Sequence, residues 1–293
     1  MTIRDTMTLG GQFTVHRLGF GAMRITGDGI WGPPKDPAAA RDVLRRAVEL
    51  GVDFIDTADS YGPHVSEELI GETLAPYPEG LVIATKAGFE RSGPHQWSTN
   101  GDPEHLRGAC DGSLKRLRLE RIDLYQLHRI DPAVALEDQI GTLLELRAAG
   151  KINLIGLSEV SVDDLARVQR LADVASVQNR YNVADRSWDD VVDACTAQDI
   201  AFIPWSPLAI GRLARPGGPL DEIAAAHDAT PGQVALSWLL HRSPTVVPIP
   251  GTSSVAHVED NVAAADIELD DADIARLDEA ARRDGAQGQA RQR

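Results

Sequence analysis

Short apolar runs alternate with longer amphipathic segments along almost the whole chain, and this alternation constrains the fold more than any other feature. Near-continuous apolar strands are typical of a parallel sheet covered by helices. Eight such strands, interleaved with helices in 293 residues, predict an α/β fold of the (β/α)₈ (TIM) barrel type. A doubly wound open sheet is the competing architecture. The expected strands are 17–22, 54–58, 81–86, 122–128, 152–158, 176–181, 201–207 and 245–251.

Helix-start signals stand between these strands. An acceptor side chain precedes a proline at three of the expected starts, and a capping-box-like pair, Ser161 and Asp164, opens another. A Gly10–Gly11 turn between β-prone residues predicts an N-terminal hairpin that closes the barrel floor. The helices expected on these signals are 36–50, 103–118, 162–172 and 230–241.

No linker divides the chain, so we expect one barrel domain over 1–293, with a frayed polar tail from about 282 to 293. The net charge of −15 opposes nucleic acid or an anionic membrane as partner. Two cysteines in helical stretches, the lack of a signal-peptide pattern and the lack of a long apolar run indicate a reduced, cytoplasmic protein. We expect a monomer or a weak homo-oligomer, with no bound metal.

One motif match is accidental. Residues 27–32 (GDGIWG) match the G-x-G-x-x-G dinucleotide fingerprint, which has meaning only between a strand and a helix N-terminus. Pro33 and Pro34 follow directly, and the next expected helix begins only near Asp36. This segment is therefore predicted to be a loop over the barrel mouth.

Polar side chains at the carboxyl ends of the strands are the candidate catalytic groups, because barrel active sites lie there. Lys86 ends the third strand and stays charged near the core only with a partner. Asp56 on the second strand supplies one, although a purely structural ion pair explains these two residues equally well. Tyr61 follows that strand, and an adjacent ammonium would lower the pKa of its phenol, so that it donates a proton near neutral pH. His128 ends the fourth strand and can orient a carbonyl oxygen or join a proton relay.

The set Asp56, Tyr61, Lys86 and His128 resembles the catalytic tetrad of the aldo-keto reductase superfamily. The motifs that carry the resemblance cover residues 17–262 in family order and spacing: GVDFIDTADSYG, VIATK, IDLYQLH, IGLS, SVQNRYN, FIPWSPL and IPGTSS…HVEDN. The resemblance implies an NADP(H)-dependent oxidoreductase acting on carbonyl or CH–OH groups, with NADPH favoured and NADH the weaker alternative.

The resemblance also implies the cofactor site. Ser158 and Gln178 correspond to residues that hydrogen-bond the nicotinamide carboxamide, and Trp205 corresponds to an aromatic that stacks on the nicotinamide. The remaining cofactor-binding residues implied at the barrel mouth, on the pyrophosphate loop and around the adenosine are Gly21, Met23, Ser206, Leu208, Gly211, Gly251, Thr252, Ser253, Ser254, His257 and Asn261.

Three positions depart from the family pattern. Gly251 and His257 replace basic residues that pair with the 2′-phosphate, so the preference for NADPH over NADH is expected to be weaker. Ser253, Ser254 and the backbone N–H groups at the start of the following helix are expected to bind the phosphate instead. Glu159 stands where Asn is usual beside Ser158, and its carboxylate either accepts from the carboxamide or turns outward.

The substrate is predicted to be a small or aromatic aldehyde. RLGFGAMRITGDGIWGPPKD, SYGPHVSEELI and IPGTSSVAHVEDNVAA resemble bacterial members described as pyridoxal reductases. Trp31 and Trp97, in loops after the first and third strands, either wall a pocket for a flat ring or only pack loops. Two rival functions remain: a slow NADP(H)-binding sensor or regulatory module, and a barrel isomerase or lyase that uses Lys86 as a Schiff-base amine.

Overall fold

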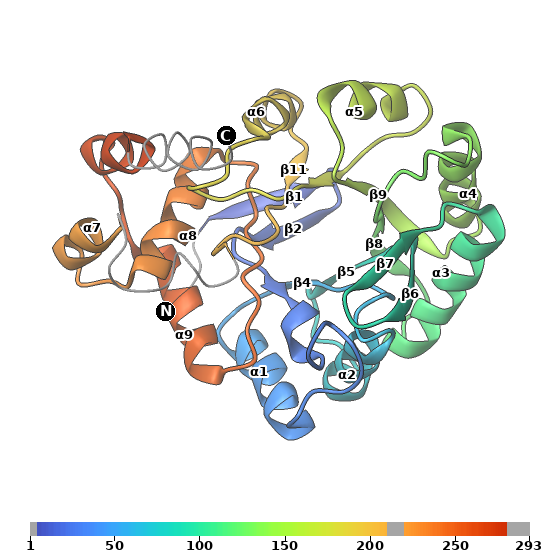
Figure 1. Cartoon of the computed structure of the whole chain (residues 1–293), viewed down its shortest axis with the longest axis horizontal. Coiled ribbons are helices and arrows are strands. Elements are labelled where there is room, and N and C mark those ends of the chain that lie inside the picture. The colour runs from blue at the N-terminus through green and yellow to red at the C-terminus, as the bar shows by residue number, and fades with distance from the viewer. Residues whose placement is uncertain (1–4, 210–219, 280–293) are drawn as a thin grey trace.

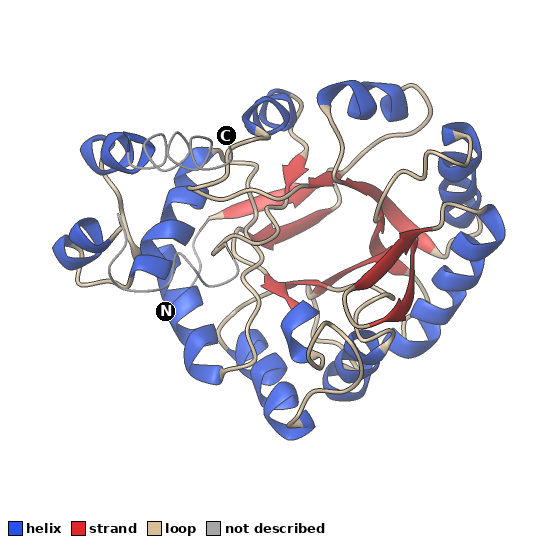
Figure 2. Cartoon of the chain, in the orientation of Figure 1, coloured by secondary structure: helices blue, strands red, loops and turns tan. Residues whose placement is uncertain are grey.

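The computed structural model describes residues 5–209 and 220–279, and its centre is a parallel sheet that curls into a barrel. Helices surround the strands on the outside (Figure 2). The sheet has seven strands in the order β11-β10-β9-β8-β5-β4-β3, so strands that follow one another around the barrel also follow one another along the chain. These strands are β3 (Phe20–Gly21), β4 (Phe54–Asp56), β5 (Val82–Ala87), β8 (Ile122–Leu127), β9 (Ile152–Ser158), β10 (Ser176–Gln178) and β11 (Ala201–Phe202).

The last predicted strand closes the barrel as an irregular segment. The N–H of Val247 donates to the carbonyl of Phe202 on one side at 2.9 Å, and the N–H of Gly19 donates to the carbonyl of Pro248 on the other side at 2.9 Å. Pro248 and Pro250 have no N–H, so the ladder toward β3 consists only of bonds to their carbonyls. The predicted (β/α)₈ barrel is thus confirmed, with prolines preventing a regular eighth strand.

The helices form the outer layer (Figure 1). Asp36 caps α1 by accepting from two backbone N–H groups, and Ser161 with Asp164 forms the capping box predicted for α5. A short 3-10 helix, η1 (Ala22–Ile25), follows β3. The α-helices are α1 (Pro37–Glu49), α2 (Val65–Leu74), α3 (Pro103–Leu117), α4 (Leu136–Ala148), α5 (Val162–Gln169), α6 (Asp189–Ala197), α7 (Asp221–Ala226), α8 (Pro231–Arg242) and α9 (Val255–Ala263).

Two antiparallel hairpins lie outside the barrel sheet. β1 (Thr6–Leu9) and β2 (Phe13–His16) form the predicted N-terminal hairpin, and Met7, Leu9 and Val15 pack with apolar side chains inside the barrel. The second hairpin, β6 (Phe89–Gly93) and β7 (Gln96–Thr99), follows β5 at its carboxyl end. Trp97 was predicted to lie in a loop after the third strand, and this was wrong: in that connection it lies on β7.

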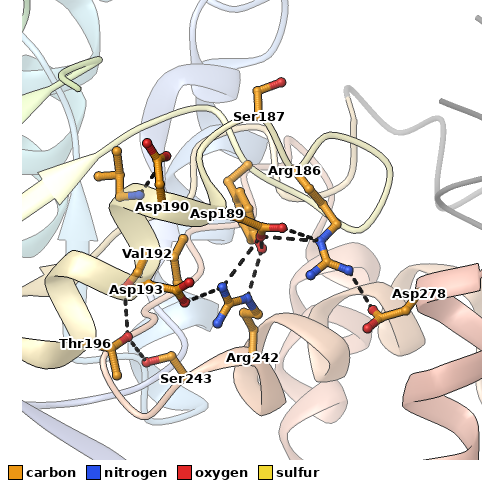
Figure 3. Close-up of polar contacts among 12 residues, drawn as sticks. Arg186, Ser187, Asp189, Asp190, Val192, Asp193, Thr196, Arg242, Ser243 and Asp278 are labelled. Atoms are coloured by element: carbon orange, nitrogen blue, oxygen red, sulfur yellow. Dashed lines mark hydrogen bonds and ion pairs between the residues drawn. The ribbon is translucent and has the colours of Figure 1, made fainter. Parts of the chain in front are cut away.

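An ionic cluster joins α6 to α8 (Figure 3). Arg242 contacts Asp193 at 2.6 Å and Asp189 at 3.6 Å, and Arg186 bridges Asp189 to Asp278. The hydroxyl of Tyr181 donates to Asp189 as well. These charges are matched to one another, so the cluster is best explained as support for the helix layer.

Within the described part of the chain, no helix combines the length and the apolar character needed to cross a membrane. The expected frayed tail at 282–293 lies outside the described residues.

Candidate active site

Lys86 and Asp56 form a buried ion pair at the carboxyl ends of β5 and β4. The ammonium of Lys86, which is 0% exposed, donates to Oδ1 of Asp56 at 2.6 Å and to the carbonyl of Thr57 at 2.8 Å. Its third donor points toward the hydroxyl of Tyr61 at 3.4 Å. All three protons of the ammonium therefore have acceptors, and one of these is the phenol proposed for catalysis.

The second oxygen of Asp56 is held by two amides. Oδ2 accepts from Nε2 of Gln126 at 2.9 Å and from Nε2 of Gln178 at 2.8 Å. Gln126 pairs with Lys86 in the sheet register, so both side chains face the barrel interior. Gln126 was not predicted from the sequence, although a polar side chain in an apolar strand was a signal for it.

Charge compensation keeps Lys86 protonated. Burial acts to lower its pKa, but the charges and hydrogen bonds of Asp56 and Tyr61 outweigh burial and raise the pKa above its usual value. An uncompensated ammonium at this depth would lose its proton instead. The site thus contains a fixed positive charge beside the phenol.

The pKa of Tyr61 moves in the direction opposite to our expectation. Burial raises it, and Lys86 lowers it as predicted, but burial is the larger effect, so the net direction is upward. The phenol is therefore protonated at neutral pH. That is the form required of a group that donates a proton to a developing alkoxide.

His128 lies on the other side of Tyr61. The two ring centroids are 5.9 Å apart with an interplanar angle of 80°. Burial, with help from the charges of Lys86 and Arg129, lowers the pKa of His128 well below its usual value. The imidazole is neutral at pH 7, and its Nδ1 contacts the hydroxyl of Ser60 at 3.4 Å. The four predicted catalytic side chains thus converge from β4, β5, β8 and the loop after β4.

Aromatic side chains line the site next to His128. The Phe89 ring lies 4.6 Å from that of His128, and the Trp97 ring lies 6.5 Å from that of Tyr61. Trp31 is joined to this group through Arg91, whose guanidinium carbon lies 3.6 Å from the Trp97 ring centroid and 5.6 Å from that of Trp31. Phe89 and Arg91 were not predicted from sequence.

Arg91 joins three loops at the mouth. Nη1 donates to the carbonyls of Ile30 at 3.0 Å and Ser60 at 2.9 Å, and Nη2 donates to the carbonyl of Gly29 at 3.1 Å. Nε donates within its own hairpin, to the carbonyl of Gln96 at 2.9 Å. The predicted loop that contains Trp31 is therefore bound both to the Tyr61 segment and to the β6–β7 hairpin.

Glu159 holds the side chain of Trp205. Its Oε1 accepts from the indole N–H at 2.5 Å and from the backbone N–H of Arg180 at 2.6 Å. Glu159 has a φ of 54°, a left-handed conformation that turns its side chain toward Trp205. Neither alternative raised from the sequence describes this arrangement, in which the carboxylate fixes an aromatic side chain at the end of β11.

The residues expected around the nicotinamide retain unused hydrogen-bonding atoms. Ser158 Oγ accepts from Nη1 of Arg129 at 3.1 Å, which leaves its own proton free to donate. Among the described residues, the amide oxygen of Gln178 accepts no hydrogen bond, and the buried Oγ of Ser206 has no partner. Such polar atoms at the ends of β9, β10 and β11 fit the carboxamide and the adjoining groups of a nicotinamide dinucleotide.

The expected adenosine and phosphate ligands surround the start of α9. The hydroxyl of Thr252 accepts from the N–H of Ser254 at 3.1 Å and contacts Nδ1 of His257 at 3.3 Å. No side chain of the described residues caps the start of α9, so its first N–H groups stay available to an anion. Ser253 and His257 are exposed at this helix end, and Asn261 lies two turns further along it.

Backbone packing alone explains why two of the predicted cofactor-binding positions, Gly21 and Gly251, are glycine. A Cβ on Gly21 would lie 2.6 Å from the carbonyl oxygen of Ile249, and a Cβ on Gly251 would lie 2.5 Å from that of Gly21. Glycine therefore allows β3 to approach the closing segment. Met23 lies on η1 and Leu208 in a turn after β11, both half-buried, whereas Gly211 lies outside the described residues.

Comparison with known proteins shows the family. Residues 17–282 match the aldo/keto reductase family model. The chain is 50% identical over 279 residues to an uncharacterized oxidoreductase of Schizosaccharomyces pombe, covering 95% of this chain and 91% of that one. It is 41% identical over 280 residues to pyridoxine 4-dehydrogenase of Escherichia coli, covering 94% and 97% of the two chains. An aldo-keto reductase from Klebsiella pneumoniae, solved with NADPH, superposes with a TM-score of 0.81 at 26% identity and 95% coverage of both chains.

Fold and similarity together define a (β/α)₈-barrel oxidoreductase. The chain belongs to the aldo/keto reductase family, whose members use a nicotinamide cofactor.

Proposed function

We propose that this protein reduces aldehydes to alcohols with NADPH, and that Tyr61 donates the proton. The observation that carries the proposal is the contact of 3.4 Å between the ammonium of Lys86 and the hydroxyl of Tyr61, held by the ion pair with Asp56. A buried, protonated phenol beside a fixed cation is suited to proton donation, because the cation stabilises the tyrosinate that remains.

Each residue around Tyr61 has a separate role in the proposed reaction. Tyr61 and the neutral His128 flank the space where a carbonyl oxygen docks, and both bind that oxygen by donating hydrogen bonds. Lys86 stabilises the phenolate after proton transfer, and Asp56 keeps Lys86 charged and in place. The nicotinamide, when bound, supplies the hydride. Trp205, Ser158 and Gln178 orient its ring in this proposal.

The cofactor is NADPH in preference to NADH. The Klebsiella pneumoniae relative was solved with NADPH, and the open N-terminus of α9 with Ser253 and Ser254 supplies donors for a 2′-phosphate. Gly251 and His257 supply no fixed positive charge there. The discrimination is therefore expected to be smaller than in a site with a bidentate arginine.

The substrate is a flat aromatic aldehyde, with pyridoxal as the first candidate. Phe89 and Trp97 present ring surfaces next to His128, and the Escherichia coli relative is named for the oxidation of pyridoxine. Aromatic rings bind well between such side chains through area burial and edge contacts. The S. pombe relative carries an oxidoreductase name and supports the same class of chemistry.

The proposal is tested by following NADPH consumption with pyridoxal, a nitrobenzaldehyde and methylglyoxal, with NADH as the parallel cofactor. We expect turnover of the aromatic aldehydes with NADPH and slower turnover with NADH. NADPH binding without turnover of any aldehyde would contradict the proposal and favour a nucleotide-binding sensor. Borohydride trapping of a substrate adduct on Lys86 would instead favour Schiff-base chemistry.

A further inference from the structure

Arg129 lies in the site, and the proposed mechanism does not use its charge. It follows His128 directly after β8, and its Nη1 donates to the carbonyl of His128 at 2.6 Å and to Oγ of Ser158 at 3.1 Å. Its guanidinium carbon lies 5.3 Å from the Phe89 ring centroid. The cation thus contacts the backbone of His128, a side chain expected at the nicotinamide and one ring of the aromatic pocket.

The guanidinium has no ionic partner within the described residues. No carboxylate oxygen there lies within 4.0 Å of Arg129, although the chain carries a net charge of −15. The carboxylate with the largest electrostatic effect on Arg129 is that of Glu159, whose Oε1 accepts from Trp205 and from the backbone N–H of Arg180. Keeping a half-buried guanidinium charged without an ionic partner costs folding free energy. Burial lowers the pKa of Arg129 for the same reason. Such a cation is what a site for an anionic group requires.

Two of its nitrogens remain free to bind. Among the described residues, Arg129 donates hydrogen bonds through Nη1 alone, so the N–H groups of its Nε and Nη2 have no acceptor. Arg91, which lies over the Trp97 ring, differs in this respect because its nitrogens all donate to backbone carbonyls. Nε and Nη2 present the planar, two-donor edge that matches a carboxylate.

The charge also lies close to the reacting centre. Arg129 interacts electrostatically with both Tyr61 and His128, which are the two residues proposed to hold the carbonyl oxygen. Its Nη1 also donates to the backbone carbonyl of His128 at 2.6 Å, so an anion bound at Arg129 lies in the same part of the site as the substrate carbonyl. The edge contact between Phe89 and His128 places an aromatic surface beside the same space.

We propose that Arg129 binds an oxygen anion that the substrate carries beside its carbonyl group, so that the preferred aldehydes are aromatic rings with an ortho phenolate or carboxylate. This inference rests on the proposed reductase function and specifies its substrate class. Pyridoxal, whose aldehyde stands next to a phenolic oxygen, belongs to that class.

The test compares matched substrates in wild type and Arg129→Gln. The pairs are 2-formylbenzoate with its methyl ester, and 2-hydroxybenzaldehyde with 2-methoxybenzaldehyde. They are assayed at about pH 9, where the phenol of 2-hydroxybenzaldehyde is mostly ionised, so that in each pair a methyl group replaces the negative charge. We expect the kcat/KM ratio of anionic to neutral substrate to fall about 10- to 100-fold in Arg129→Gln and to recover partly in Arg129→Lys. Because the measured quantity is a ratio, effects on cofactor binding cancel. Equal ratios in wild type and Arg129→Gln would overturn the inference.

A control and a binding measurement separate this inference from the proposed function. Arg170→Gln removes one positive charge from the exposed end of α5, and we expect it to leave the ratio as in wild type. Benzoate is not reduced, so the change in its Kd between wild type and Arg129→Gln, measured by calorimetry, reports the contribution of Arg129 to anion binding without turnover. We expect benzoate binding to weaken at least tenfold in Arg129→Gln, and an unchanged Kd would overturn the inference. Absence of turnover with every aldehyde, while benzoate binding depends on Arg129, would refute the reductase and support the anion site.

Discussion

The indole N–H of Trp205 donates to Oε1 of Glu159 at 2.5 Å, across the ends of β11 and β9. The same carboxylate oxygen accepts the backbone N–H of Arg180 at 2.6 Å, which fixes the carboxylate in turn. In the proposed cofactor site, an aromatic side chain held in this way would stack on a nicotinamide without losing further side-chain entropy on binding. The residue that departs from the family pattern at position 159 therefore has a clear structural task.

Glu159→Ala is expected to weaken NADPH binding about tenfold, because Trp205 loses the acceptor that orients it. Glu159→Gln keeps an acceptor oxygen and should bind NADPH within about threefold of wild type. Quenching of tryptophan fluorescence by NADPH measures both constants. Equal weakening in the two variants would mean that the negative charge of Glu159, and not its hold on Trp205, matters for binding.

Asp56→Asn is expected to lower the free energy of unfolding by about 3–5 kcal/mol, because it leaves the buried ammonium of Lys86 without its counter-charge. Urea denaturation measures the change. Asp28→Asn is the matched control, since Asp28 pairs with Lys35 on the surface with side-chain exposures of 88% and 87%. The control should change stability by less than about 0.5 kcal/mol. A small effect in Asp56→Asn would show that Lys86 is neutral in the folded protein.

Arg91→Lys is expected to raise the KM for aromatic aldehydes and to lower the free energy of unfolding by about 2 kcal/mol. Lysine keeps the charge but cannot reach the carbonyls of Gly29, Ile30 and Ser60 together, so the loops that carry Trp31 and Tyr61 loosen. Kinetics with a nitrobenzaldehyde and methylglyoxal give the comparison. Because methylglyoxal lacks a ring, its KM should rise less. An equal rise for both substrates would argue against an aromatic pocket at this position.

Asp59→Asn should become increasingly stabilising as the pH rises. Burial and the neighbouring Glu67 raise the pKa of Asp59 to about 8, and its Oδ1 has no partner among the described residues. The folded protein therefore holds a proton that the unfolded chain releases near pH 4, so the stability due to this group is complete below about pH 4 and is lost as the pH rises to about 8. Asparagine has no such proton. The difference in unfolding free energy between variant and wild type should thus grow between about pH 5 and pH 8, and a constant difference would contradict the raised pKa.

The alternation of apolar runs and helix signals predicted the barrel because each βα unit carries its own local signal. The exact ends of the strands could be predicted less well from the sequence. The last strand contains Pro248 and Pro250, and only the folded neighbours reveal that their carbonyls still pair with β3. The β6–β7 hairpin escaped prediction because its side chains are mostly polar and half-exposed, so its period-2 signal is weak.

The candidate site was predicted where residues stand at strand ends, and missed where the contact joins distant loops. Arg91 gives no sequence signal of its role, since its partners are backbone carbonyls from three separate segments. The direction of the pKa shift at Tyr61 could not be predicted from the sequence either. It depends on the balance between burial and the charge of Lys86, and only the folded geometry sets that balance.

The most direct test of the central claim is the turnover number of Tyr61→Phe with NADPH and the best aldehyde of the panel. Phenylalanine keeps the ring that packs against Trp97 and His128 but removes the donated proton. We predict a loss of about 10²–10⁴-fold in kcat, with NADPH still bound at a Kd close to that of wild type. Turnover by Tyr61→Phe equal to that of wild type would contradict the account and show that another group donates the proton.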